Sequence, residues 1–209
     1  MPKIIVKVVA MRIVLASANR GKIREIEKLL SSYKVVAYSD LLGEFDIIED
    51  GDSFKANAII KAKAIYQKLI ENNDTKDTLV LSDDSGISVD VLDGEPGIYS
   101  ARYAGVGVSD KDNLNKLINS LKAKGVRRSN AHYTAAMALI YEGNLQCVHG
   151  WMHGEVIDEA KGEGGFGYDP IFIPVNETQT LAELPDHVKN NISHRSAALN
   201  LMEKIIKTL

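Results

Sequence analysis

Two adjacent carboxylates follow a short apolar run near the middle of the chain. Residues 79–81 predict the end of a buried strand, and Asp83, Asp84, Ser85 and Gly86 predict a turn directly after it. Mg²⁺ favours carboxylate oxygens, water and substrate phosphates, and a strand end presents such side chains with little reorganisation. The segment therefore indicates a divalent metal site. A solvated Asp-rich turn has the same composition, and is the commoner meaning of this motif alone.

A second polar segment indicates an anion site. Residues 12–16 are an apolar run, residues 17–22 a polar loop, and the apolar residues that follow recur at helical spacing. The free N–H groups and the dipole at a helix N-terminus attract phosphate, and Lys22 in the first turn adds a full positive charge. The loop lacks the Walker A pattern. A purely structural role, with Asn19 as the helix cap and Lys22 as a surface charge, is an equal alternative.

Lys61 lies on a predicted helix with a buried stripe. An acidic segment at residues 46–52 precedes this helix, and Ser53 is expected to cap it. Its apolar stripe follows the 3.6-residue period through Phe54, Ala58, Ala62, Ile65 and Leu69. Asn57 and Lys61, four residues apart, share a different face. Because lysines usually lie on a solvated face, the helix alone gives Lys61 no function.

Two segments nearer the C-terminus have features of a nucleobase site. Residues 162–170 contain four glycines around Phe166 and Tyr168, so the backbone can approach a ligand closely while an aromatic ring offers a stacking face. Ser193 is expected to cap the last helix, which places His194 and Arg195 in its first turn, against the helix dipole. Glycine loops and surface arginines are also ordinary features, so each segment alone is only an indication.

The remaining elements predict a mixed sheet with flanking helices. Residues 35–38 predict a strand, and Ser109 with Asp112 fits a capping box ahead of a helix. Residues 131–141 and 145–157 predict two strands joined by a tight hairpin. An antiparallel hairpin in an otherwise βα chain favours a mixed α/β sheet. In the last helix the side chains expected to point inward are Ala198, Leu201, Met202 and Ile205.

Composition narrows the possible partners. The 209 residues, 45% hydrophobic and 25% charged, suit one domain, which we expect over residues 11–209 after an N-terminal extension at residues 1–10. A net charge of −3 without long charged runs gives no basic footprint for nucleic acid. No apolar run approaches the ~20 residues of a membrane span. The single Cys147 rules out an intramolecular disulfide and fits a cytoplasmic location.

Six segments together resemble one known family. They occur in the order SANRGK (17–22), NAIIKA (57–62), SDDSG (82–86), PGIYSARY (96–103), GFGYDP (165–170) and SHR (193–195). With these segments in register, the chain from about Met11 to near its C-terminus closely resembles the inosine/xanthosine triphosphate pyrophosphatases. The resemblance implies Mg²⁺-dependent hydrolysis of ITP, dITP and XTP to nucleoside monophosphate and pyrophosphate, which cleanses the nucleotide pool. It also implies a homodimer, and a fold of two lobes around a deep active-site cleft.

The resemblance also assigns roles to individual positions. Glu49 and Asp84 match metal ligands, and Asp84 also matches the general base; Asp83 is its neighbour, and Ser85 is placed with the substrate contacts. Expected triphosphate contacts are Ser17, Asn19, Lys22 and Lys61. Expected contacts to the purine and the neighbouring phosphate are Phe166, Gly167, Tyr168, Asp169, Lys189, His194 and Arg195. Donors among this last group would favour bases with a 6-oxo acceptor over adenine.

Two positions depart from the family pattern, and two other functions stay open. Lys55 replaces a glutamate often found two residues before Asn57, and Ala18 replaces the usual glycine or asparagine; both bear on fine geometry beside the matched positions. The alternatives are a purine nucleotide-binding module without activity, and a pyrophosphatase for other modified nucleotides. The clustered acids favour an enzyme, because a pure binder has little use for like charges beside a polyphosphate.

Overall fold

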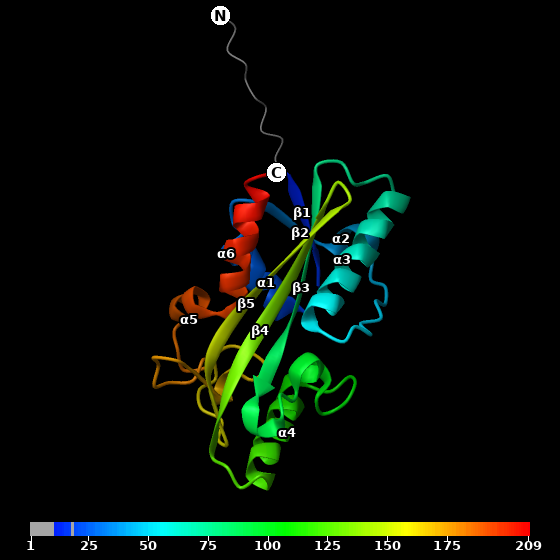
Figure 1. Ribbon diagram of the computed structural model, residues 1–209. Helices are drawn as coiled ribbons and strands as arrows, with labels where there is room; N and C mark the ends of the chain where they lie inside the picture. Colours follow the sequence, from blue (N-terminus) through cyan, green and yellow to red (C-terminus); the bar gives the residue numbers. More distant parts are fainter. Residues whose placement is uncertain (1–10, 18) are drawn as a thin grey trace, which may run out of the picture.

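A computed structural model describes residues 11–17 and 19–209, so the predictions for residues 1–10 and for Ala18 lie outside the described residues. Its strands are β1 (Arg12–Ala16), β2 (Lys34–Ala37), β3 (Thr78–Val89), β4 (Arg128–Tyr141), β5 (Asn144–Ile157) and β6 (Phe172–Pro174). Within the described residues they form one six-stranded sheet in the order β2-β1-β3-β4-β5-β6 (Figure 1). β1 runs parallel to β2 and β3, and the other neighbours are antiparallel. The mixed sheet predicted from the hairpin is confirmed.

Helices flank this sheet. They are α1 (Arg20–Leu29), α2 (Tyr38–Leu42), α3 (Phe54–Glu71), α4 (Asp110–Ala123), α5 (Asp186–Ile192) and α6 (His194–Ile206), with short 3₁₀ turns η1 (Asp90–Leu92), η2 (Gly97–Arg102) and η3 (Asp169–Ile171). The predicted caps are confirmed: the Ser53 side chain accepts from the Ala56 N–H, Ser193 accepts from Ser196, and Ser109 forms a capping box. These local signals fix where α3, α4 and α6 begin.

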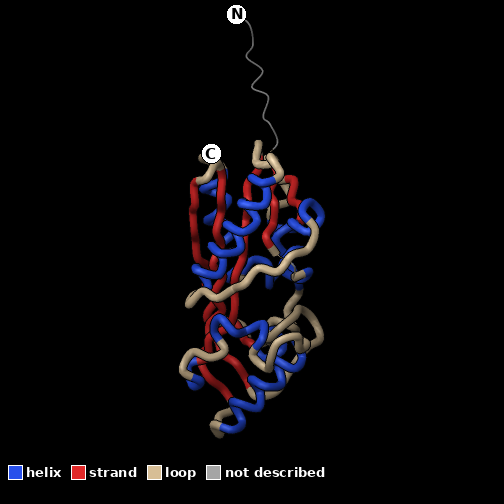
Figure 2. The backbone as a smooth tube through the Cα atoms, turned by 90° about the vertical axis from the view of Figure 1, so that its right-hand side faces the viewer, coloured by secondary structure: helices blue, strands red, loops and turns tan. Residues whose placement is uncertain are grey.

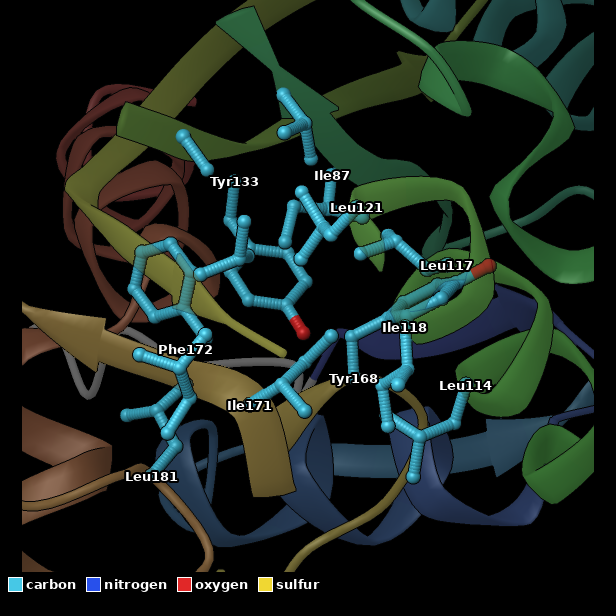
Figure 3. Packing of buried hydrophobic residues seen from close by; sticks show 14 of the residues in the cluster. Ile87, Leu114, Leu117, Ile118, Leu121, Tyr133, Tyr168, Ile171, Phe172 and Leu181 are labelled. Carbon is cyan, nitrogen blue, oxygen red and sulfur yellow. The ribbon is translucent and has the colours of Figure 1, made fainter. Parts of the chain in front are cut away.

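The buried apolar side chains form clusters at two ends of the sheet. At one end α1 and α6 cover one face of the strands, and α3 covers the other. We call this end the upper lobe, since it lies above the sheet centre in Figure 1. At the other end, the lower lobe, α4 packs on β3, β4 and β5 with the segment around β6 (Figure 3). Leu81 of β3 lies in an upper cluster and Ile87 in the lower one, so the same strand serves both lobes. Figure 2 shows the long strands running between them.

One sequence prediction about β3 is wrong. The segment from Asp83 to Gly86 is not a turn, because β3 continues to Val89 and pairs with β4 along residues 80–89. Strand pairing satisfies the backbone of these polar residues, so the two acids sit inside a strand rather than after it. A consequence follows from the period of two: neighbouring side chains on a strand point to opposite faces, so Asp83 and Asp84 must have different surroundings.

Three smaller differences concern other elements. The strand expected over residues 35–38 is β2, and Tyr38 begins the short helix α2, which the sequence reasoning missed. In α6 Ala198 and Met202 are buried as predicted, but Leu201 is exposed and Leu199 is buried in its place.

Among the described residues, no helix combines the length and the apolar character that crossing a membrane requires.

Candidate active site

A cavity of about 270 Å³ lies where the two lobes meet. β1 pairs with β3 only as far as Ser82, and Pro96 bridges to Ser88 on the same edge, so among the described residues no strand pairs with residues 83–87 of β3 on that edge. The cavity forms beside this open edge, and residues of both lobes line it: Lys61 comes from α3, and Tyr168 from the segment before β6. Every site residue predicted from the sequence lines this cavity, so the fold brings all of them together.

On one face of β3, Asp84 forms a cluster with Glu49, from the segment before α3, and with Lys61 of α3. The Lys61 Nζ donates to Glu49 Oε2 at 2.8 Å and to Asp84 Oδ1 at 3.1 Å. Lys61 of α3 is buried. Burial acts to lower its pKa, but attraction to Asp84 and Glu49 outweighs burial, and the pKa of Lys61 is raised. Burial raises the pKa of Asp84, against the opposing attraction of Lys61 and Lys22. The cluster thus holds a carboxylate of enhanced basicity beside a lysine.

The other face of β3 carries Asp83 in a different setting. Its Oδ2 lies 2.9 Å from the Lys22 Nζ and 3.5 Å from the Arg195 Nη2, and its side chain is fully buried. Burial acts to raise the pKa of Asp83, but Arg195 and Lys22 outweigh it, and the pKa lies well below the usual range of an aspartate. Asp83 is therefore a permanently charged anchor for two cations.

The loop before α1 has the geometry of a helix cap that also faces the cavity. The Asn19 Oδ1 accepts from the Gly21 N–H at 2.9 Å and from the Lys22 N–H at 3.1 Å, and Ser17 Oγ accepts from the Asn19 N–H. The structural role considered for Asn19 is thus confirmed. Because Ser17, Asn19 and Lys22 also line the cavity, the cap places the positive end of the helix and one lysine at its edge.

The glycine-rich segment forms another part of the cavity wall, and its Phe166 ring lies close to Gly21 of α1. Asp169 is buried, and its Oδ2 accepts from the Phe166 N–H at 2.9 Å and from the Lys189 Nζ at 2.6 Å. Burial raises the pKa of Asp169, although Lys189 opposes the shift. The Lys189 Nζ also lies 4.7 Å from the centre of the Phe166 ring. A Cβ at Gly165, where φ is +73°, would collide with Asp169 Oδ2, so the segment requires glycine there.

The start of α6 brings His194 and Arg195 to the same wall. Arg195 is almost fully buried, and it donates to Ser85 Oγ at 3.0 Å and forms an ion pair with Glu25. Burial acts to lower the pKa of Arg195, but Asp83 and Glu25 raise it. Burial and the neighbouring Arg195 hold the pKa of His194 well below its ordinary value, so this imidazole is neutral at pH 7.

The sequence reasoning missed two residues of this wall, Glu25 and Tyr133. Glu25 is buried on α1, pairs with Arg195, and lies 3.7 Å from the Lys189 Nζ. Its only sequence signal was its place three residues after Lys22, on the same side of a helix. Tyr133 is buried on β4 and stacks on His194. It lies within an apolar strand pattern, where nothing distinguished it from a core residue.

The acids on the Asp84 face suit a divalent cation. Glu49 Oε2 and Asp84 Oδ1 both contact one positive group, the Lys61 Nζ, and Asp84 Oδ2 is buried without a hydrogen-bond partner among the described residues. No group of three or more His, Cys, Asp or Glu in this part of the chain is arranged to hold a metal. Two carboxylates with space beside them fit Mg²⁺, which commonly takes its remaining ligands from water and substrate phosphates.

Comparisons with known proteins identify the family. A model of the Ham1 family matches residues 13–205. A dITP/XTP pyrophosphatase from Sulfurimonas denitrificans is 56% identical over 199 residues, which cover 95% of this chain and 100% of that protein. A dITP/XTP pyrophosphatase from Campylobacter jejuni subsp. jejuni serotype O:2 is 49% identical over 95% of this chain and 98% of that protein.

Solved structures agree with this assignment. The Staphylococcus aureus Ham1 protein superimposes with a TM-score of 0.80 at 39% identity, over 94% of this chain and 98% of that chain. A HAM1 protein from Coxiella burnetii gives a TM-score of 0.82 at 33% identity, over 95% and 100%. The family resemblance and the α/β fold predicted from the sequence are therefore confirmed. The chain belongs to the Ham1 family.

Proposed function

We propose that this chain hydrolyses the deaminated purine nucleoside triphosphates ITP, dITP and XTP to nucleoside monophosphate and pyrophosphate, and so cleanses the nucleotide pool. Relatives at 49–56% identity are named dITP/XTP pyrophosphatases, and they match over 95% of this chain. The observation that carries the proposal is that one cavity joins a lysine–carboxylate cluster to a wall with an aromatic ring and several donors. A nucleoside triphosphate likewise has a charged phosphate end, which suits the lysines, and an aromatic base, which suits the ring and the donors.

The lysines supply the phosphate end of the site. A triphosphate brings roughly four negative charges, which must be balanced before water can approach phosphorus. Lys22 and Lys61 are now paired with carboxylates, at 2.9 Å from Asp83 and at 2.8 Å from Glu49. These cations are thus held within the cavity in advance, and a bound triphosphate replaces their internal partners.

Glu49 and Asp84 are the residues that we propose to hold Mg²⁺. The ion supplies charge neutralisation on the phosphates and the leaving pyrophosphate. The chain itself would supply the base: Asp84 lines the cavity beside Glu49 and Lys61, which is the position that the family resemblance assigns to the general base. Asp84 would orient the attacking water and accept its proton.

The glycine-rich segment and the start of α6 supply recognition of the base. The Phe166 ring offers a stacking face, Lys189 and Arg195 lie beside this ring, and His194 lines the same cavity. Hypoxanthine and xanthine carry an acceptor at position 6, where adenine carries an amino donor. Donors of the protein can hydrogen-bond to the oxygen at position 6 of hypoxanthine or xanthine. With adenine they would face another donor, the amino group, which disfavours adenine.

Assembly, location and domain extent complete the proposal. By resemblance to the family, we propose a homodimer that acts in the cytoplasm, with residues 11–209 as one catalytic domain. Exposed apolar side chains such as Trp151 (53% exposed) on β5 are compatible with an interface on the sheet. Light scattering coupled to size-exclusion chromatography measures the oligomeric state, and a mass of one chain would contradict the dimer.

The activity is tested with pure protein, Mg²⁺ and each of ITP, dITP, XTP, GTP and ATP, with the products separated by chromatography. Monophosphate and pyrophosphate from the first three substrates are expected. Asp84→Asn should abolish turnover while nucleotide affinity stays within about tenfold. Asp52→Asn, a change of an exposed acid outside the cavity, is the matched control and should retain turnover. Diphosphate and phosphate as products, or no turnover of ITP and XTP, would contradict the proposal.

A further inference from the structure

Tyr133 is an aromatic residue that the proposed chemistry does not use. It lies on β4, is 7% exposed, and lines the cavity. Its ring stacks on the His194 ring, with centroids 4.7 Å apart and planes 9° apart. Phe172 packs edge-on against Tyr133, with centroids 4.9 Å apart (Figure 3). Two contacts of this kind restrict rotation of the Tyr133 ring, which in turn restricts the plane of the imidazole.

The surroundings of His194 determine which ring atom can meet a ligand. Nδ1 is buried without a hydrogen-bond partner among the described residues. A buried N–H without an acceptor is rarer than an unshared lone pair, so the neutral ring carries its proton on Nε2. Since His194 lines the cavity, Nε2–H is the donor available to a bound base.

The backbone of His194 is fixed from the sheet below it. Gly150 of β5 lies directly under the start of α6, where an added Cβ would collide with the His194 carbonyl oxygen and the Ala198 nitrogen. This close approach leaves the first turn of α6 little freedom to move toward or away from the cavity. With the backbone held by the sheet and the ring plane held by Tyr133, the direction of the Nε2–H bond is determined.

We infer that Tyr133 is a specificity-determining positioning residue: by stacking on His194 it aims the Nε2–H donor at the position-6 oxygen of a deaminated purine. The identity of the base rests on the proposed function, but the stacking and its effect on affinity are testable without turnover. Loss of the stack lets the imidazole rotate, which weakens the hydrogen bond to a 6-oxo base. It leaves binding of a 6-amino base unchanged.

The test compares binding of IMP and AMP, which differ at position 6, by isothermal titration calorimetry. The wild type should prefer IMP. Tyr133→Leu should lower the IMP/AMP affinity ratio about tenfold, the scale of one hydrogen bond. Tyr133→Phe, which keeps the ring, should stay within about twofold of the wild type. Leu114→Ala on α4 is the matched control, because Leu114 belongs to the same buried cluster but lies apart from Tyr133 in Figure 3 and does not line the cavity, and its ratio should also stay within about twofold.

A double-mutant cycle separates positioning from general loosening. In a His194→Gln background, Tyr133→Leu should no longer change the ratio, because Tyr133 acts through His194. An unchanged ratio in Tyr133→Leu alone, or an equal fall in Leu114→Ala, would overturn the inference. So would a wild type that binds IMP and AMP equally, whereas failure to hydrolyse ITP would refute only the proposed function.

A second readout is NMR of the ligand-free wild type, which does not depend on whether Tyr133→Leu folds. In the ligand-free wild type, the Cε1–H resonance of His194 should be shifted upfield by the Tyr133 ring and should show an NOE to it. Tyr133→Phe should keep the shift. Absence of both signals in the wild type would overturn the inference even if Tyr133→Leu does not fold.

Discussion

Asp83 and Asp84 are neighbours of the same type, yet substitution by asparagine should destabilise the protein strongly at Asp83 and very little at Asp84. Asp83 is fully buried between Lys22 and Arg195. Removing one partner of a buried ion pair typically costs ~3–5 kcal/mol. Since Arg195 keeps its contact with Glu25, we expect Asp83→Asn to lose about 3 kcal/mol, the lower end of that range.

Asp84→Asn should leave the free energy of unfolding within about 1 kcal/mol of the wild type, a small effect for a buried position. Burial raises the pKa of Asp84 despite Lys61, so the charged form is a net cost to the folded state at pH 7. Lys61 keeps Glu49 as a partner at 2.8 Å when Asp84 is neutral. The variant should therefore be folded and inactive.

Urea unfolding at pH 7 measures both effects. With a slope of about 2.5 kcal/mol per M, a loss of 3 kcal/mol lowers the midpoint by about 1.2 M. The pH dependence gives a second check: the pKa of Asp83 is depressed in the folded state, so its contribution is complete above the unfolded pKa near 4 and is lost as pH falls. Asp83→Asn should flatten this acid limb. A midpoint of Asp83→Asn at or above that of Asp84→Asn would refute the reasoning.

Three further predictions concern the cavity and the helix α6 beside it. Lys61→Met should raise the affinity of the ligand-free protein for Mn²⁺, because it frees two carboxylates from their internal cation; titration by electron paramagnetic resonance measures this, and the exposed Lys63→Met should bind like the wild type. Gly150→Ala should cost about 1–3 kcal/mol in urea unfolding through overpacking under α6, and a cost below 0.5 kcal/mol would contradict the close approach. The depressed pKa of His194 means that the unfolded chain takes up a proton first as pH falls below ~6.5, so stability declines there; His194→Asn should show a flatter midpoint between pH 7 and 5, and an unchanged slope would argue against a neutral imidazole.

The parts of the fold that depend on local signals could be predicted from the sequence. The start of α3 follows from the Ser53 cap and that of α4 from the Ser109 box, because caps act within one turn of helix. The hairpin of β4 and β5 follows from two apolar patterns around Glu142 and Gly143, both of which have positive φ in the turn. Such features need no knowledge of the rest of the chain.

The parts that failed depend on distant partners. Asp83 and Asp84 have low strand propensity, and only pairing with β4, more than 50 residues later, keeps them in a strand. Glu25 is buried because Arg195, 170 residues away, neutralises it. Only the family resemblance predicted that the fourteen site residues share one cavity, because each segment alone had an ordinary structural explanation. In α6 the error at Leu201 was one of helix phase, which the sheet beneath decides.

Because β3, β4 and β5 run through both lobes, a change that destabilises one lobe also destabilises the other. Neither lobe possesses a sheet of its own, so a cavity cut into the lower core also loosens strands on which α3 and α6 rest. The two lobes are therefore expected to unfold in a single transition. A destabilising substitution near α4 should then also lower the stability of the region around Lys61, although the two do not touch. A destabilising substitution at one end of these strands is therefore expected to lower the stability of both lobes.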